Sequence, residues 1–318
     1  MIAPADLAAC RAMIRTGSLS FHAASRLLPA RVRDPALALY AFCRVADDDV
    51  DEGQDKVRAV LRLRERLDLI YAGRPEPRPP DRAFAAVVRD FDMPRALPDA
   101  LLEGLAWDAM GRRYRTLSDL HAYSARVASA VGVMMCVLMR VRDPDALARA
   151  ADLGLAMQLT NIARDLGEDA RAGRLFLPLD WLAEAGIEAE GFLADPRPSP
   201  ALAGVVRRLL AVADDLYRRA GAGVSVLPAD CRLGIAAARH IYAAIGAEVA
   251  RAGHDSVTRR ARTSRGQKLV LMGKAAGAAL LTHLMPQPAQ LHARPVPEVA
   301  FLVEAAGQRP ARAHRSET

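Results

Sequence analysis

The stretch QLTNIARDLGED, residues 158–169, has an earlier counterpart of the same character, YAFCRVADDDVDE, residues 40–52. Each holds two aspartates four residues apart, Asp165 and Asp169 in the one and Asp47 and Asp51 in the other. On a helix, residues four apart share a face, with Cβ atoms roughly 5–6 Å from each other. Each stretch therefore directs two carboxylates towards one point.

The polar face extends beyond the aspartates. Positions three or four residues earlier hold Arg44 and Tyr40 in the first stretch, and Asn161 and Gln158 in the second. The flanking positions are apolar, and a helix that is apolar nearly all round is buried. A polar stripe on a buried helix lines a cavity or a site.

Two such acidic pairs facing each other form an oxygen-rich site suited to Mg²⁺. In proteins Mg²⁺ keeps several waters and binds one or two carboxylates plus substrate phosphates. A single acidic run is often only a solvated face, but two runs with equal spacing and matched stripes argue against that. A di-iron bundle is excluded because it needs Glu-x-x-His pairs, and none of the seven histidines has Glu three residues before it. The two stretches predict a diphosphate site.

Composition narrows the class of protein. The chain has 318 residues, a net charge of +7 and a pI near 9.6. Such a balance suits polyanionic small molecules or an anionic membrane surface. Nucleic acid is disfavoured as a partner, because the basic residues are spread out and no aromatic residues alternate with them. The four cysteines form no CxxC, and the first residues lack the order of a signal peptide, so we expect a cytoplasmic protein.

The pattern along the chain predicts helix after helix and no strands. We expect helix starts at Asp34-Pro35, at Ser118 and at Asp143-Pro144, the last running to Asp169, and further helices over 200–220, 228–252 and 265–285. The apolar run 268–285, interrupted by Lys274, is expected to be a buried helix because it is too short to span a bilayer. One all-α domain over residues 1–290 is predicted, followed by a disordered basic tail over 291–318.

Several segments resemble one protein family. The chief ones are YAFCRVADDDVDE and NIARDLGEDARAGRLFLP, supported by SLSFHAASRLLP, YSARVASAVGVMM and ARHIYAAI followed by VTRRAR. Over roughly residues 15–290 the chain is similar to the head-to-head prenyl synthases, the family of phytoene, squalene and dehydrosqualene synthases. The resemblance implies an isoprenoid-synthase helical bundle around a central apolar channel, with Mg²⁺ bound between two aspartate-rich helices.

The resemblance also implies roles for single residues. Asp47, Asp51, Asp165 and Asp169 would bind Mg²⁺, and they would be catalytic together with Arg44, Tyr40 and Tyr242. The substrate-binding residues would be Ser18, Ser20, Phe21, Tyr123, Gln158, Asn161, Arg164, Arg174 and Arg259. Phe176 stands where the family usually has Tyr, which removes a hydroxyl from the channel.

The implied reaction joins two geranylgeranyl diphosphates through prephytoene diphosphate to phytoene. It needs Mg²⁺, for which Mn²⁺ would substitute, and no NADPH. Peripheral contact with the inner face of the membrane and association with other carotenoid enzymes are further expectations. The small residues Ala23, Ala24 and Ser25, one turn beyond Phe21, would leave depth for a C20 tail. Squalene or dehydrosqualene synthesis from farnesyl diphosphate remains the alternative activity, and a catalytically silent, membrane-associated binding protein on the same scaffold is the alternative of another class.

Overall fold

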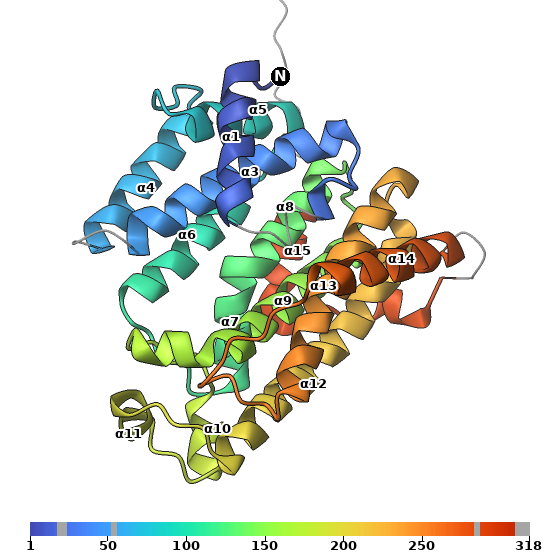
Figure 1. The fold of residues 1–318 in the computed structure, drawn as a ribbon. Helices are drawn as coiled ribbons and strands as arrows, with labels where there is room; N and C mark the ends of the chain where they lie inside the picture. The colour runs from blue at the N-terminus through green and yellow to red at the C-terminus, as the bar shows by residue number, and fades with distance from the viewer. Residues whose placement is uncertain (18–23, 52–55, 283–286, 309–318) are drawn as a thin grey trace, which may run out of the picture.

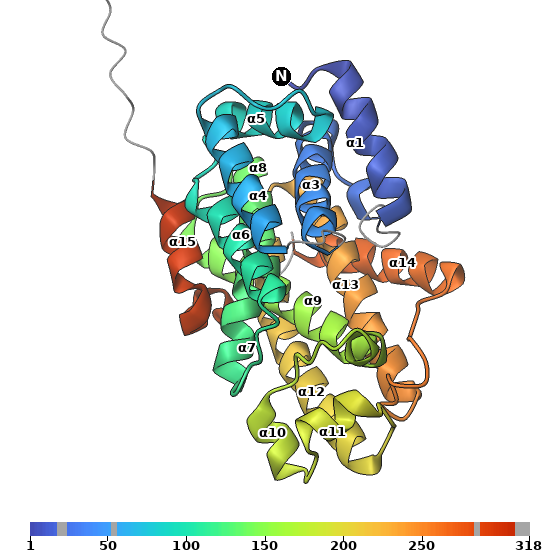
Figure 2. The same ribbon diagram turned by 90° about the vertical axis from the view of Figure 1, so that its left-hand side faces the viewer.

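The computed structural model describes residues 1–17, 24–51, 56–282 and 287–308, except for the side chains of residues 15–17, 47, 50, 51 and 265. Within these ranges the chain forms helices and turns and no strand, so the predicted all-α class is confirmed. The long helix α9 (Pro144–Arg171) runs through the middle of the molecule, and the other helices surround it (Figures 1 and 2).

The first half of the chain forms one side of the molecule. Its helices are α1 (Pro4–Gly17), α3 (Ala30–Asp51), α4 (Lys56–Tyr71), α5 (Pro79–Phe91) and α6 (Ala96–Ala109). Helix α3 packs against α1, α4 and α5, and the rings of Phe42 and Phe84 stack with centroids 4.3 Å apart. This packing buries one side of α3 and leaves Tyr40 and Arg44 on the side that faces α9.

A helix with a π-helical interruption follows, made of α7 (Leu117–Ser124), η1 (Ala125–Ser129) and α8 (Ala130–Leu138). Among the described residues, Leu117–Leu138 is the helix that is long and apolar enough to span a membrane, but 61% of its most apolar window is buried in this structure. It passes close to α9, because a Cβ on Gly154 would lie 2.5 Å from the Ser129 Cα. Glycine therefore allows the π-helical segment to approach the backbone of α9.

The start of α9 agrees with the prediction. Asp143 caps it by accepting a hydrogen bond from the Ala146 N–H at 2.9 Å, and Pro144 occupies the first turn. Helix α9 then packs against α12 (Pro200–Gly223) and α13 (Ala229–Arg251). Two short helices, α10 (Leu179–Glu184) and α11 (Ala189–Ala194), precede α12, and the turn η2 (Val224–Val226) follows it.

Two predicted helix starts are wrong. Helix α3 begins before Asp34-Pro35, at Ala30, because the Pro29 carbonyl already accepts a hydrogen bond from the Arg33 N–H at 2.8 Å. Helix α7 is capped by Thr116, not Ser118. The Thr116 hydroxyl accepts from the Asp119 N–H while the Asp119 carboxylate accepts from the Thr116 N–H, a reciprocal capping box.

The expectation of a buried helix over 268–285 is also wrong. Helix α14 (Arg265–Leu281) lies on the outside of the molecule against α13, and Ala275 is its buried residue among those described. Its apolar character is therefore not explained by burial within the part of the chain that the structure describes.

The predicted disordered tail, residues 291–318, is ordered as far as it is described. The turns η3 (Ala289–His292) and η4 (Pro297–Val299) lead into α15 (Ala300–Gly307), which buries Leu302 and Ala306 against α8 and α9. The buried Arg149 side chain donates hydrogen bonds to the carbonyls of Gln290 and Ala293 at 2.7 and 3.0 Å. Apolar burial outweighs the Pro- and Arg-rich composition here, and residues 309–318 lie outside the described ranges.

Candidate functional site

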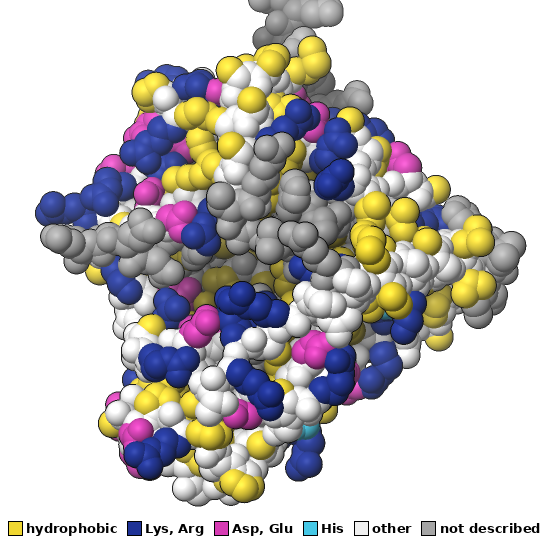
Figure 3. All heavy atoms as spheres, viewed as in Figure 1, with side chains coloured by type: hydrophobic (Ala, Val, Ile, Leu, Met, Phe, Trp, Pro, Cys, Tyr) yellow, Lys and Arg dark blue, Asp and Glu magenta, His cyan; other side chains and the backbone are white. Residues whose placement is uncertain are grey.

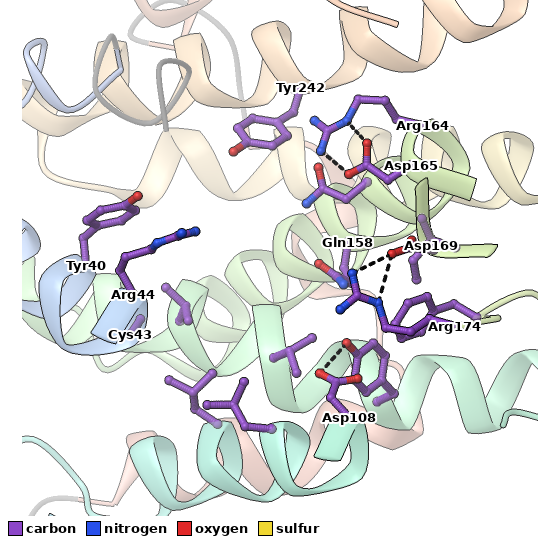
Figure 4. A pocket seen from close by; sticks show the side chains of 18 of the residues that line it. Tyr40, Cys43, Arg44, Asp108, Gln158, Arg164, Asp165, Asp169, Arg174 and Tyr242 are labelled. Atoms are coloured by element: carbon purple, nitrogen blue, oxygen red, sulfur yellow. Dashed lines mark hydrogen bonds and ion pairs between the residues drawn. The ribbon is translucent and has the colours of Figure 1, made fainter. Parts of the chain in front are cut away.

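The carboxylates of Asp165 and Asp169 line a cavity of about 500 Å³ enclosed mainly by α3, α6, η1, α8, α9 and α13 (Figure 4). They lie one turn apart on the C-terminal part of α9, as their spacing predicts. Both side chains are mostly buried. A pair of partly desolvated carboxylates in a cavity is a candidate site for a cation or a polar substrate.

Most of the residues predicted for the site surround this one cavity. Arg44 extends from α3 towards α9, and Tyr242 approaches from α13 (Figure 4). The predicted residues that line the cavity are Tyr40, Arg44, Tyr123, Gln158, Asn161, Arg164, Asp165, Asp169, Arg174 and Tyr242. They come from segments up to about two hundred residues apart in sequence, so the fold brings the two polar stripes to face each other.

Asp165 is held between two arginines. Arg164 donates to its carboxylate with Nε at 2.7 Å, and Arg260, from the loop before α14, donates with Nε at 2.7 Å and Nη2 at 3.2 Å. Burial alone would raise the pKa of Asp165, but the hydrogen bonds from these two guanidinium groups outweigh it and lower the pKa. Asp165 is therefore an anion at neutral pH.

Asp169 has a different environment. Burial raises its pKa to about 6, and one guanidinium group, that of Arg174 at 3.1 and 3.3 Å, only partly opposes this effect. The neighbouring carboxylates of Asp165 and Glu168 also contribute to this raised pKa. The Asp169 carboxylate is thus the less stabilised anion of the pair, and an additional cation would stabilise it.

The first acidic stretch is described only in part. Asp47 and Asp51 lie in the last turns of α3 by their backbone, but their side chains lie outside the description. Between them, Asp48 accepts hydrogen bonds from Arg44, with Nε at 3.0 Å. Ser18, Ser20 and Phe21 also lie outside the described residues.

Arg259 is not brought to the site. Its guanidinium donates to the Ala252 carbonyl at 3.3 Å, and it is the next residue, Arg260, that reaches Asp165. The loop carrying both is held against α9, because the Gly167 N–H donates to the Ser256 carbonyl at 3.0 Å. A Cβ on Gly167 would lie 2.4 Å from the Val257 carbonyl oxygen, so this approach requires glycine.

One acidic residue of the cavity was missed by the sequence reasoning. Asp108, on α6, lines the cavity and accepts a hydrogen bond from the Tyr123 hydroxyl at 2.9 Å. Burial and this carboxylate raise the pKa of Tyr123 well above its ordinary value. The Tyr123 ring stacks on Phe176 with centroids 5.3 Å apart. No second acidic residue four positions away marks Asp108 in the sequence, so spacing gave no signal for it.

A second, apolar cavity of about 290 Å³ adjoins the first. The two share the lining residues Val127, Val131, Met135, Gln158, Asn161 and Tyr242. The remainder of its lining includes small and aliphatic side chains, among them Ala24, Ser25 and Leu28. The site therefore has a charged compartment that opens into an apolar one.

The donor atoms of the charged compartment suit a hard divalent cation. Asp165 and Asp169 provide carboxylate oxygens, and Asn161 and Gln158 provide amide oxygens in the same cavity. Among the described side chains, no group of three or more His, Cys, Asp or Glu residues gathers in a way that would hold a metal. The side chains of Asp47 and Asp51 are not among those described. Oxygen donors without thiolate or imidazole favour Mg²⁺ over zinc or iron.

Comparison with known proteins agrees with the family resemblance seen in the sequence motifs. A family model described as squalene/phytoene synthase matches residues 14–267. The full chain is 66% identical to a phytoene synthase of Rhodobacter capsulatus and 64% identical to one of Cereibacter sphaeroides, covering 94% and 92% of their lengths.

Solved structures agree with these relatives. A dehydrosqualene synthase in complex with ligand matches with a TM-score of 0.78 and 30% identity, over 86% of this chain and 96% of that one. The squalene synthase HpnC from Alicyclobacillus acidocaldarius matches in fold, with a TM-score of 0.73 and 24% identity over 79% and 95% of the two chains.

Proposed function

Since the chain belongs to the squalene/phytoene synthase family, we propose that it condenses two geranylgeranyl diphosphates head to head, through prephytoene diphosphate, to phytoene and diphosphate. Two relatives named phytoene synthase match the chain over its full length, which supports this reaction over others in the family. The chain is thus a prenyltransferase, and the proposal assigns its substrate and product.

The two adjoining cavities are the main support for this function. A prenyl diphosphate has a small, highly charged head and a long hydrocarbon tail. The cavity of about 500 Å³ carries the arginines and aspartates, and the cavity of about 290 Å³ beside it is mainly apolar. A substrate of this shape fits with its diphosphate in the first and its tail in the second.

We assign the diphosphate to the arginines of the charged cavity. Arg44, Arg164 and Arg174 line it from α3, from α9 and from the loop after α9, so they surround its centre. Guanidinium groups bind phosphate oxygens through two parallel N–H donors. Each of the three also donates to a carboxylate in the structure, and the diphosphate would share or replace these partners.

Ionisation of the allylic diphosphate is the demanding step, because it creates a carbocation and an anionic leaving group. Arg44, Arg164 and Arg174 stabilise the negative charge that develops on the leaving group. The apolar walls formed by Val127, Val131 and Met135 exclude water that would quench the cation. The aromatic rings of Tyr123 and Phe176, which stack on each other, also line this cavity and would stabilise a positive charge that forms beside them.

We propose Mg²⁺ as the cofactor, held by Asp165 and Asp169 and, from α3, by Asp47 and Asp51. When bound, the cation would neutralise diphosphate charge and favour departure of the leaving group. Mn²⁺ has the same preference for oxygen ligands and is expected to substitute. No reduced nicotinamide is expected, because phytoene keeps its central double bond and the net reaction is not a reduction.

The test is product analysis with the full-length protein. It is incubated with the C20 diphosphate and Mg²⁺ but without NADPH, and the hydrocarbon and released diphosphate are identified. We expect phytoene, and we expect a chelator to abolish its formation and added Mn²⁺ to restore it.

A parallel incubation with the C15 diphosphate tests the second candidate, which the similarity to a dehydrosqualene synthase structure favours. Hydrocarbon formed only from the C15 substrate would replace the proposal with dehydrosqualene or squalene synthesis. A requirement for NADPH would identify the squalene-forming reaction. We further propose a cytoplasmic location; association with other carotenoid enzymes stays a prediction.

A further inference from the structure

Helix α14 exposes an apolar face to solvent. Leu269, Val270, Leu280 and Leu281 are 66%, 61%, 65% and 51% exposed. At 100° per residue these four positions lie on one side of the helix, together with the exposed Gly273 and Gly277 between them. Figure 3 shows hydrophobic side chains gathered over the part of the surface where Figure 1 places α14. Single exposed leucines are ordinary, but a continuous strip of this kind marks an interaction surface.

The opposite side of the helix is the one attached to the protein. Among the described elements α14 packs on α13, where Ala275 is buried and Met272 partly buried against Ala236 and Ala237. The exposed leucines therefore contribute nothing to the described core. Packing within the described residues therefore does not require these four side chains to be apolar.

The surroundings of this face are positively charged. From Arg262 to Leu281, which covers α14 and the residues just before it, the sequence contains Arg262, Arg265, Lys268 and Lys274 and no Asp or Glu. Lys274 lies at the edge of the apolar strip itself, and Lys268 lies one turn from the start of the helix. An apolar helix face flanked by lysine and arginine is the chemistry that binds a bilayer containing anionic lipids.

The position of α14 relates this face to the cavities. On one side of α13, Gly234, Ile235 and Ala238 line the apolar cavity, and on another side Ala236 and Ala237 pack against α14. A surface bound by α14 would thus be separated from the tail compartment by a single helix. This matters if the substrate and product are long-chain lipids, as the proposed function holds.

We propose that α14 docks the protein onto an anionic lipid bilayer, with Leu269, Val270, Leu280 and Leu281 in the interface and the nearby Lys and Arg residues on the lipid headgroups. The proposal deepens the proposed function, because a C20 diphosphate and a C40 hydrocarbon both partition into that bilayer. The occupant is a lipid surface; a second copy of the chain is the competing occupant that the test must distinguish.

The test is sedimentation of the full-length protein with vesicles of phosphatidylcholine alone or of phosphatidylcholine with phosphatidylglycerol. We expect binding to the anionic vesicles, weakened by salt, and little binding to the neutral ones. In the double variant Leu269→Gln/Leu280→Gln the partition coefficient should fall at least about tenfold, because two apolar side chains no longer enter the interface. The matched control is Val57→Gln/Leu61→Gln on α4, whose side chains are 60% and 53% exposed on the other side of the molecule.

Unchanged binding in the α14 variant, or an equal loss in the α4 variant, would overturn the proposal. So would a dimeric wild type that becomes monomeric in the α14 variant while neither binds vesicles, since a second copy would then cover the face. Turnover with detergent-solubilised substrate, without vesicles, is measured in parallel. It should be equal in both variants and in the wild type, so loss of the enzymatic activity itself is distinguished from loss of docking.

Discussion

Asp165 and Asp169 lie one turn apart on α9, yet the protein treats the two carboxylates differently. Two guanidinium groups lower the pKa of Asp165 despite its burial, whereas Asp169 has one guanidinium partner and a pKa raised to about 6. A helical spacing of four residues predicts only that such groups share a face. The difference comes from Arg260, which arrives from a loop almost a hundred residues away.

Neutralising Asp165 should remove activity and leave the fold intact. We expect Asp165→Asn to lower kcat by at least ~10²–10³, the range for losing one electrostatic stabiliser of a transition state. The far-ultraviolet circular dichroism should stay that of the wild type. The control is Asp68→Asn, an exposed aspartate paired with Arg95 away from the cavity, which should keep full activity. Near-normal turnover in Asp165→Asn would refute the assigned role.

Asp169 gives a prediction about pH. Its pKa in the folded, metal-free protein is about 6, above the value of about 3.9 in an unfolded chain. Its ionisation therefore opposes folding. The folded state is most stable with Asp169 protonated, below about pH 4, and it loses that stability as pH rises through about 6. In the presence of a chelator, Asp169→Asn should raise the free energy of unfolding at about pH 8 by at most about 3 kcal/mol, and the melting temperature should rise with it. Near pH 4 the substitution should change the melting temperature little. A melting temperature lowered equally at both pH values would show that Asp169 acts through its contact with Arg174 instead.

The adjacent arginines in the loop before α14 form a natural matched pair. Arg260→Gln removes the contact with Asp165, so we expect a loss of roughly ten- to a hundredfold in kcat/KM, the range for a charged hydrogen bond. Arg259→Gln removes only an exposed bond to the Ala252 carbonyl and should stay within twofold or so of the wild type. Steady-state kinetics on both variants measures this; the reverse order of effects would restore the sequence-based choice of Arg259.

Some of the residues at the site could be predicted from the sequence, and others could not. The helical stripes Tyr40–Arg44 and Gln158–Asn161–Asp165–Asp169 could be predicted, because periodicity within one helix is a local property. The contributions of Asp108 and Arg260 could not, because neither belongs to a polar stripe within one helix and each reaches the site only through tertiary packing. Within the segment VTRRAR, the local sequence does not indicate which arginine contacts Asp165.

Among the elements, α9 and the π-helical segment η1 show how backbone contact fixes the cavity wall. The Gly154 position faces the Ser129 Cα and the Ala128 carbonyl, where a Cβ would come within 2.5 and 2.7 Å. Both neighbours are backbone atoms, which cannot move aside as the end of a flexible side chain can. The π-helical turn thus carries Val127 to the point where it lines both cavities.

Gly154→Ala should therefore destabilise the protein, although alanine is the better helix former. We expect a loss of ~1–3 kcal/mol, the range for overpacking. The control is Gly204→Ala on α12, where nothing lies within 4 Å of the new Cβ, and a gain of about 0.4–1 kcal/mol is expected. Denaturant unfolding of both variants measures the difference; stabilisation by Gly154→Ala would mean that the two backbones separate freely.

The starts of the helices and the C-terminal region also show how far local sequence signals can predict the structure. Asp143-Pro144 begins α9 as predicted, whereas Asp34-Pro35 lies inside α3, because the helix had already formed after Pro29. The segment Ala300–Gly307 is a short, mainly apolar stretch that follows a Pro- and Arg-rich one, and its packing on α8 and α9 decides that it forms an ordered helix. Local signals locate helices well, but whether a given helix is buried, as in α14 and α15, is decided by the rest of the molecule.

At the scale of the whole molecule, the fold joins a charged and an apolar compartment around α9. The six residues lining both compartments come from the α7–α8 region, from α9 and from α13, so the junction exists only when all three are assembled. The sequence predicted a diphosphate site from one-helix patterns and an apolar channel by resemblance. The dimensions and position of the channel required the tertiary structure.

Ser25 tests whether the apolar compartment sets the length of the substrate. It lies just before α3, is 3% exposed and lines the apolar cavity of about 290 Å³. Ser25→Phe would fill space equal to several methylenes, each worth about 0.8 kcal/mol when buried. A C20 tail reaches deeper than a C15 tail, so we expect turnover of the C20 diphosphate to fall much more than turnover of the C15 diphosphate. Ser25→Ala, which leaves the space open, is the control and should keep the C20 preference.

The competing explanation is that Ser25 is a packing residue, since overpacking at a buried site costs ~1–3 kcal/mol. Rates on both substrates and the melting temperature are therefore measured on the same samples. Equal losses on the two substrates with a lower melting temperature would assign Ser25 to packing. A selective loss on the longer substrate at an unchanged melting temperature would place the end of the prenyl tail beside Ser25, because only a filled cavity, and not a weakened fold, distinguishes chains by their length.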